Sequence, residues 1–192
     1  MLGLAAAFGC SALLAAPAGA KDKINFKLVP TKGLPAGCAP KAKASAKLET
    51  LGFAERLTIT VSGFAPGTPL VLFAIQIPNA PFGVGWYLSD LEIGPKGTVT
   101  KRIITRLNDE TFAVGNAAAP APQTHPEDAD NSKAFKPVHT YHLGIWFDSV
   151  EAGASAGCPG GPTVFNGDHT AGVQVLNTGT FEDDEGPLLQ IN

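Results

Sequence analysis

The chain has 192 residues, a formal net charge of −3, and 22 glycines and 16 prolines spread along it. Stretches that are free of glycine and proline and long enough for a helix are few, which argues against a helical bundle and favours many short strands and turns. The length suits one domain with a sizeable core, and we predict an all-β fold.

Residues 1–20 have the features of a secretory signal peptide. They carry no charged side chain, are apolar over most of their length and end in Ala18-Gly19-Ala20, a small-residue pattern that suits signal peptidase. We therefore expect cleavage near Ala20 and a secreted or otherwise extracytoplasmic chain that begins at Lys21. Two alternatives stay open, a retained apolar helix and lipidation at Cys10. No later apolar segment is long enough to be a transmembrane segment of the mature chain.

Period-two alternation of apolar and polar side chains predicts strands at residues 24–28, 42–48 and 57–62, and an apolar run predicts a fourth at residues 70–77. The third strand alternates aliphatic residues with hydroxyls, as a half-buried strand does, and the fourth is almost continuously apolar, as a strand covered on both faces is. Gly63 to Pro69 separates these two strands and contains Pro66-Gly67, a pair suited to a tight turn. We predict that the two strands form a hairpin around which the rest of the chain is organised.

In the second half of the chain, amphipathic or apolar runs predict further strands at residues 83–93, 98–107, 138–147 and 170–176. The turn Gly94-Pro95-Lys96-Gly97 predicts a hairpin between the first two of these. Residues 148–157 predict one short helix that is capped by Asp148 or Ser149 and ends at Gly157. Residues 116–137 hold four prolines and no periodic pattern, so we predict a long loop there.

Amphipathic strands of this kind line a sandwich or a barrel. About eight of them, with turn signals between and a signal peptide before, resemble the secreted immunoglobulin-like modules of bacteria over residues 42–115. The resemblance implies an immunoglobulin-like antiparallel β-sandwich with long loops and one short helix. It would form a single domain over residues 21–192, with an N-terminal extension at 21–41. The cysteine pair and core tryptophan of antibody domains are absent.

Two late segments, HTYHLGIWF at 139–147 and FNGDHTAGVQ at 165–174, also resemble segments of bacterial exported proteins of unknown activity. This second likeness implies export and no particular activity.

Signal cleavage removes Cys10 and leaves Cys38 and Cys158 as the cysteines of the mature chain. An even number of cysteines in a chain bound for an oxidising compartment predicts pairing. Both lie in segments rich in glycine and proline, where no packed β-face requires a small apolar thiol. We predict a disulfide between them.

Charge is distributed unevenly along the chain. Residues 21–50 carry seven lysines against Asp22 and Glu49, a balance of +5, whereas residues from 108 onward carry a balance of −10. Such asymmetry can mark a surface that meets an anionic partner. The lysines at 41, 43 and 47 are more simply interpreted as a solvated face, or as charges that protect a sheet edge. Nucleic acid is not expected, because only Phe26 is interleaved with these lysines to stack on bases.

The histidines do not predict a metal site. His139 and His142 are three residues apart in a predicted strand, so their side chains should point to opposite faces and not share one ion. A cupredoxin centre would also need cysteine and usually methionine ligands. Calcium stays open as the one candidate cofactor, because oxygen ligands are plentiful at 128–131 and 182–185. The first of these groups departs from an EF-hand loop at Lys133, where glycine is required.

One catalytic motif occurs by pattern alone. Gly153-Ala-Ser155-Ala-Gly157 matches the G-x-S-x-G nucleophile elbow, which requires a buried strand, a sharp turn, a long helix and a separately placed acid and histidine. Asp168 and His169 follow in the right order but are adjacent, which places them poorly as orienter and base. A helix end made of small residues explains the match better.

Taken together, these features favour an exported, non-catalytic binding or structural module at the cell surface or in the extracellular space, with an extracellular or cell-surface component as its partner. The candidate ligand-facing residues are His139, Trp146, Asp168 and His169. The alternative is a small secreted hydrolase or metal-dependent enzyme that uses His139, or Asp168 with His169.

Overall fold

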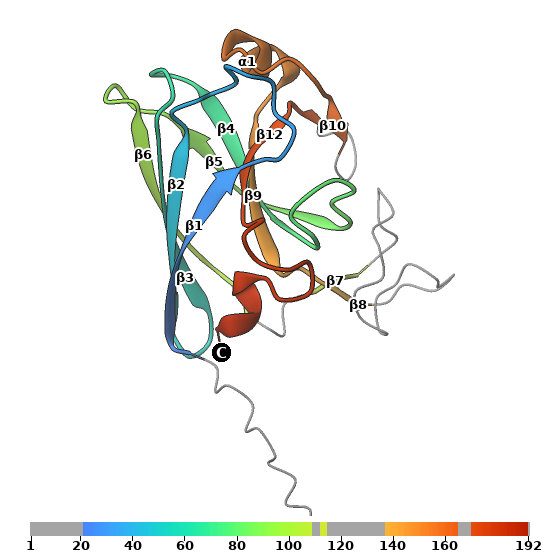
Figure 1. Ribbon diagram of the computed structural model, residues 1–192. Helices are drawn as coiled ribbons and strands as arrows, with labels where there is room; N and C mark the ends of the chain where they lie inside the picture. Colours follow the sequence, from blue (N-terminus) through green and yellow to red (C-terminus); the bar gives the residue numbers. More distant parts are fainter. Residues whose placement is uncertain (1–20, 109–111, 115–136, 165–169, 192) are drawn as a thin grey trace, which may run out of the picture.

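The computed structural model describes residues 21–108, 112–114, 137–164 and 170–191 (Figure 1). The predicted signal peptide and nearly all of the predicted long loop lie outside these residues. The elements are β1 Lys23–Pro30, β2 Lys43–Thr50, β3 Glu55–Ser62, β4 Pro69–Ile75, β5 Gly85–Glu92, β6 Thr98–Thr105, β7 Phe112–Val114, β8 Pro137–His139, β9 His142–Phe147, α1 Val150–Ser155, β10 Thr163–Val164, β11 Thr170–Ala171, β12 Gln174–Asn177 and the 3₁₀ helix η2 Pro187–Gln190. The all-β prediction is confirmed.

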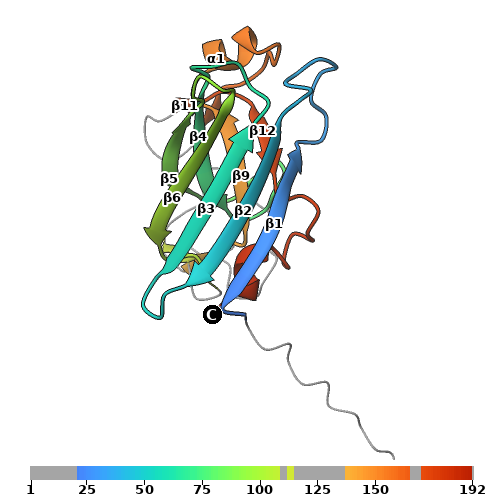
Figure 2. The ribbon, with the colours of Figure 1, turned by 90° about the vertical axis from the view of Figure 1, so that its left-hand side faces the viewer.

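Eight antiparallel strands form one sheet in the order β5-β4-β9-β12-β1-β2-β3-β6. β5 and β6 lie at the two ends of this order, yet the short turn Gly94–Gly97 joins them directly, with the Gly94 amide donating to the Thr98 carbonyl at 3.1 Å. The sheet therefore curls until its two ends meet near this turn, and the result is a nearly closed barrel (Figures 1 and 2). Two further two-stranded sheets pair β7 with β8 and β10 with β11.

The sheet is not divided into the two separate layers that an immunoglobulin-like sandwich would have. β1 pairs with β2 from Lys23 to Leu28, and its last residues Val29 and Pro30 pair with β12. This one long strand thus joins the two halves of the sheet, and closure takes the place of sandwich packing. Antiparallel pairing and one short helix are confirmed, while the sandwich is replaced by a barrel-like sheet.

Both predicted hairpins are wrong, although their strands are present. β3 pairs with β2 and β6, whereas β4 pairs with β5 and β9. Their connection crosses the end of the barrel and carries the buried Phe64, whose ring packs edge-on against Phe147 with 6.0 Å between centroids. β5 and β6 likewise find their partners on opposite sides of the barrel, so the turn between them is a corner of the sheet.

The barrel interior is filled by the apolar side chains that alternate along the strands. In β4, Leu70, Leu72 and Ala74 belong to this interior, whereas Val71, Phe73 and Ile75 join Trp146 in a second cluster. The prediction of a strand covered on both faces is therefore confirmed. The second cluster explains the continuous apolar run of β4, which a barrel with one solvated face would not need.

Two predicted strands are interrupted. Residues 138–147 divide into β8 and β9, and residues 170–176 divide into β11 and β12. The predicted helix is confirmed as α1, and the cap is Ser149, whose Oγ accepts from the Ala152 amide at 3.1 Å. Gly157 follows with a φ of 75°, as the predicted stop requires. None of the helices in the described ranges has the length and apolarity to cross a membrane.

The predicted disulfide is present. Cys38 and Cys158 are bonded across 120 residues of sequence, and both side chains are buried. The bond ties the loop that follows β1 to the loop that follows α1, above the same end of the barrel (Figure 1).

Candidate functional site

The two histidines near β9 lie in different strands. His139 ends β8, is half-buried and stacks on Tyr141, with 5.7 Å between ring centroids. His142 begins β9 and is fully buried; its Nδ1 lies 2.9 Å from Thr178 Oγ1 and its Nε2 lies 3.1 Å from the Asp183 carbonyl oxygen. The prediction of a single strand with one histidine on each face is therefore wrong, because Thr140 and Tyr141 interrupt the strand between them.

His142 holds the C-terminal segment in place. Burial removes water from the imidazolium form and lowers the pKa of His142 below its ordinary value of 6.5, while the Asp183 carbonyl opposes this shift. The neutral ring uses both nitrogens in hydrogen bonds within the fold. His142 is thus a structural residue of the β9 end.

The other predicted ligand-facing residues do not form a site among the described residues. Trp146 is fully buried, with its ring edge-on to Phe73 and Phe82 at centroid distances of 5.6 and 5.0 Å. It belongs to the second apolar cluster and presents no face to a ligand. Asp168 and His169 lie outside the described residues, as do the oxygen ligands at 128–131.

No metal centre is formed by the part of the chain that the structure describes, since no three His, Cys, Asp or Glu side chains come together there. Glu182 to Glu185, the second candidate calcium segment, is exposed after β12. Calcium at either acidic segment stays an untested prediction.

β1, β2, β3 and β6 lie side by side on one side of the barrel (Figure 2). The exposed residues of these strands include several cations. The register aligns the outward residues of these strands in rows across the sheet. We name this surface the basic face; its charged side chains are Lys23, Lys27, Lys43, Lys47, Arg56, Arg102 and the single carboxylate Glu49. Six cations and one anion give it a balance of +5 in a chain whose net charge is −3.

Glu49 neutralises only part of this charge. Its carboxylate lies 2.6 Å from Lys47 Nζ and 3.4 Å from the Arg56 guanidinium. The hydrogen bond from Lys47 is the main reason that the pKa of Glu49 lies below its usual value, so Glu49 stays ionised. Within the described ranges, the four remaining cations have no ion pair; they are Lys23, Lys27, Lys43 and Arg102.

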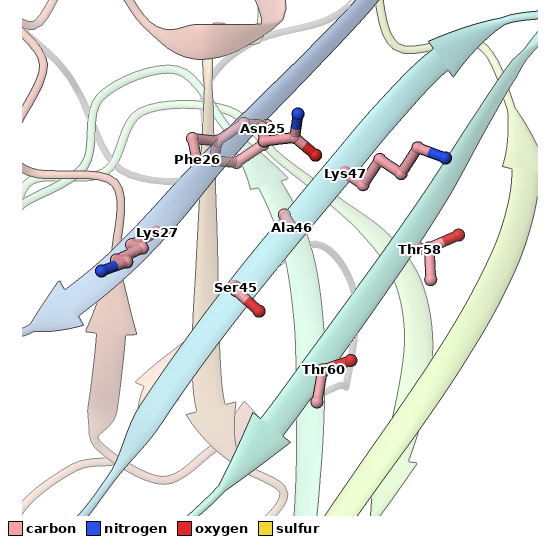
Figure 3. Close-up of a pocket in the computed structure, with 8 residues that line it drawn as sticks. All are labelled: Asn25, Phe26, Lys27, Ser45, Ala46, Lys47, Thr58 and Thr60. Atoms are coloured by element: carbon pink, nitrogen blue, oxygen red, sulfur yellow. The ribbon is translucent and has the colours of Figure 1, made fainter.

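A shallow hollow of about 290 Å³ lies on the basic face across the first three strands (Figure 3). Each strand contributes two outward polar side chains. The six are Asn25 and Lys27 from β1, Ser45 and Lys47 from β2, and Thr58 and Thr60 from β3. Phe26 and Ala46 also line the hollow, but both are buried and belong to the barrel interior.

Most polar groups of the hollow are available for a ligand. Lys47 is paired with Glu49, and the Thr60 hydroxyl is 2.9 Å from that of Thr100. The side chains of the other four, Asn25, Lys27, Ser45 and Thr58, have no hydrogen-bond partner among the described residues. The hollow therefore combines an amide, ammonium groups and hydroxyls with no carboxylate among its lining residues.

The sequence predicts part of the basic face. The lysines at 43 and 47 were interpretable as solvated or edge-protecting charges, but β2 is paired on both sides and is not an edge strand. The alternation in residues 57–62 also predicts that Thr58 and Thr60 lie on the polar side of their strand. What periodicity cannot supply is the register that places them beside Ser45 and Lys47.

A larger hollow of about 740 Å³ lies among the loops at the β1 end, where Lys32 is the one charged lining residue. Gln174 Oε1, which lines it, accepts from the Thr31 hydroxyl at 2.9 Å and from the Asn177 side-chain amide at 2.9 Å. With one charged residue in its lining, it has less charge than the basic face.

The basic face can attract and hydrogen-bond an anion, but its outward side chains include no histidine or cysteine to transfer a proton or act as a nucleophile. Comparison of the chain with known protein families, curated proteins and solved structures finds no match. Function is therefore inferred from the face itself.

Proposed function

We propose that this protein is an exported, non-catalytic binding module that holds an anionic component of the cell surface or extracellular space on its basic face. The observation that carries the proposal is the set of four cations on one side of the barrel that have no ion pair with any described residue, in a chain that is acidic as a whole. A field of one sign on one face attracts and orients an oppositely charged partner even when net charge is unfavourable.

Binding is preferred over the enzymatic alternative because of how the described histidines are used. His142 engages both ring nitrogens within the fold, and His139 stacks on Tyr141. General acid–base or nucleophilic catalysis requires a group within hydrogen-bond reach of a reacting atom. The basic face offers donors that suit recognition instead.

The first test is retention on a sulfonate cation-exchange resin at pH 7.5, where the chain carries net negative charge. We expect retention at low salt and elution as added salt screens the face, over a Debye length of about 10 Å at 0.1 M. The double variant Lys27→Gln and Lys43→Gln should elute at lower salt. A matched control, Lys32→Gln with Lys96→Gln, removes the same charge outside the face and should elute later than the first variant. Equal elution of the two double variants would contradict the proposal.

Non-catalysis is tested separately. The purified protein should show no turnover on ester, peptide, phosphate and glycoside panels. Turnover that disappears in His139→Ala or His169→Ala would establish the hydrolase alternative and overturn this part of the proposal.

A further inference from the structure

We infer that the anionic partner is an acidic polysaccharide whose charged sugar sits in the hollow formed by β1, β2 and β3. This inference rests on the proposed function, because it names the class of partner for the same face. It adds a specific site and a reason for sugar over other polyanions.

The chemistry of the hollow matches a sugar that carries a charged group. Lys27, which has no ion pair among the described residues, suits a carboxylate or sulfate, since hydrogen bonds between ionised partners are stronger than neutral ones. Lys47 lies beside it in the hollow but is already paired with Glu49. Asn25, Ser45 and Thr58 offer donors and acceptors of the kind that sugar hydroxyls exchange. A simple polyanion would use the lysines and leave these neutral groups without partners.

The spacing also suits a sugar ring. Neighbouring strands lie about 4.8 Å apart, and alternate residues along a strand lie about 6.8 Å apart. The two-by-three arrangement of polar side chains therefore presents its charges and hydroxyls over an area on the scale of a monosaccharide unit. The basic face continues beyond it to Arg102, so that further acidic units of a chain meet further positive charge.

Nucleic acid and membrane fit the face less well. Single strands are held by aromatic side chains that stack on bases, and Phe26, the only aromatic residue of the hollow, is buried. Membrane association of a basic surface is strengthened by apolar side chains that insert between lipids. The exposed apolar residues nearby, Phe53 and Ile104, lie at the end of the face where β2 turns into β3, and not in the hollow.

The test measures binding of the full exported protein by isothermal titration at 50 mM and, again, at higher NaCl. The probes are polygalacturonate, dextran sulfate, neutral dextran, oligo-dT and vesicles of phosphatidylglycerol. We expect an acidic polysaccharide to bind, neutral dextran not to bind, and oligo-dT and vesicles to bind more weakly. The first two probes distinguish carboxylate from sulfate as the preferred anionic group.

Two variants separate charge from hydroxyl recognition. Lys27→Gln should weaken binding of every anionic probe by about three- to fivefold. Ser45→Ala with Thr58→Val keeps all charges and the β-branched side chain of the strand, and should weaken only the polysaccharide, by about tenfold. Thr180→Val, an exposed hydroxyl removed outside the face, and Lys96→Gln are the matched controls and should bind the polysaccharide as the original chain does.

Each outcome of these experiments either supports or overturns the inference. Preference for an acidic polysaccharide together with selective loss in the hydroxyl variant supports the inference. Equal binding of all polyanions, with an effect of Lys27→Gln alone, overturns the inference but leaves the proposed function standing. Binding to none of the anionic probes at low salt overturns both. Circular dichroism of each variant shows whether a loss comes from unfolding.

Discussion

At the scale of single residues, His142 shows how a histidine can have a structural role. From a fully buried position, its Nε2–H donates to the Asp183 carbonyl, and Nδ1 of the neutral ring accepts from the Thr178 hydroxyl. Burial favours the neutral form of His142. Its hydrogen bond to the Asp183 carbonyl connects the C-terminal acidic segment to β9. Fold stability is thereby coupled to pH.

The sign of this coupling follows from the lowered pKa of His142. The unfolded chain takes up a proton near the ordinary pKa of 6.5, whereas the folded chain takes it up only at lower pH. The stabilising contribution is complete above pH 6.5 and is lost as pH falls below it, with a slope of at most about 1.4 kcal/mol per pH unit for one proton. Urea denaturation between pH 7.5 and 5.0 measures it. His142→Gln should be less stable and show a flatter dependence; equal slopes in the two proteins would show that other groups are responsible.

Gly144 is a second position where one residue controls local packing. A Cβ atom there would lie 2.3 Å from a ring carbon of Trp146 and 2.7 Å from Gln174 Nε2. Gly144→Ala should therefore destabilise the fold by about 1 to 3 kcal/mol through overpacking. In a Trp146→Phe background the same change should cost less, because the clashing ring atoms are gone. Denaturant midpoints of the four proteins complete the cycle, and additive effects would contradict this contact.

At the scale of elements, the short helix α1 depends on its cap more than on its length. Six residues are too few to be stable alone, and the Ser149 side chain supplies one of the missing partners of the first turn. The helix positions the loop that ends in Cys158.

The cap can be tested within one helix. Ser149→Ala should lower the free energy of unfolding by about 1 kcal/mol, because the Ala152 amide loses its acceptor. Ser155→Ala is the matched control, since its exposed hydroxyl bonds only to the Glu151 carbonyl, which already lies in the helix. Thermal or urea unfolding measures both; an equal effect of the two substitutions would mean that the cap contributes nothing specific.

At the scale of the whole molecule, the disulfide joins an early loop of the chain to a late one. Cys38 lies in the loop between β1 and β2, and Cys158 follows α1 near the last strands. The bond therefore closes a loop that contains most of the barrel, and it constrains the unfolded chain strongly.

Removing the bond should have the same effect whichever cysteine is replaced. In the chain-entropy model a loop of this size contributes about 4 to 5 kcal/mol, which is an upper figure because strain and residual structure reduce it. Cys38→Ala, Cys158→Ala and the double variant should show nearly equal losses in melting temperature. A double variant clearly less stable than either single variant would mean that the side chains matter by packing and not by the bond.

The sequence by itself determined the chemistry of each element. Alternation predicted β1 to β3 within a few residues, the nearly unbroken apolar run of β4 predicted a strand buried on both faces, and the cysteine count predicted the disulfide. These features depend on neighbours in the sequence or on counting, and they need no knowledge of which strand lies beside which. The same local signals misjudged the two hairpins, because a turn sequence does not say whether the strands it joins will pair.

Only the tertiary structure decided closure and the basic face. Whether the amphipathic strands make a sandwich or a barrel depends on β1 pairing with both β2 and β12, a contact between residues far apart in the chain. The basic face depends in the same way on register, which sets Lys27 beside Ser45 and Thr60 from separate strands. Periodicity fixes the side of a strand to which a residue points, but hydrogen bonding between distant strands fixes the residues that it meets there.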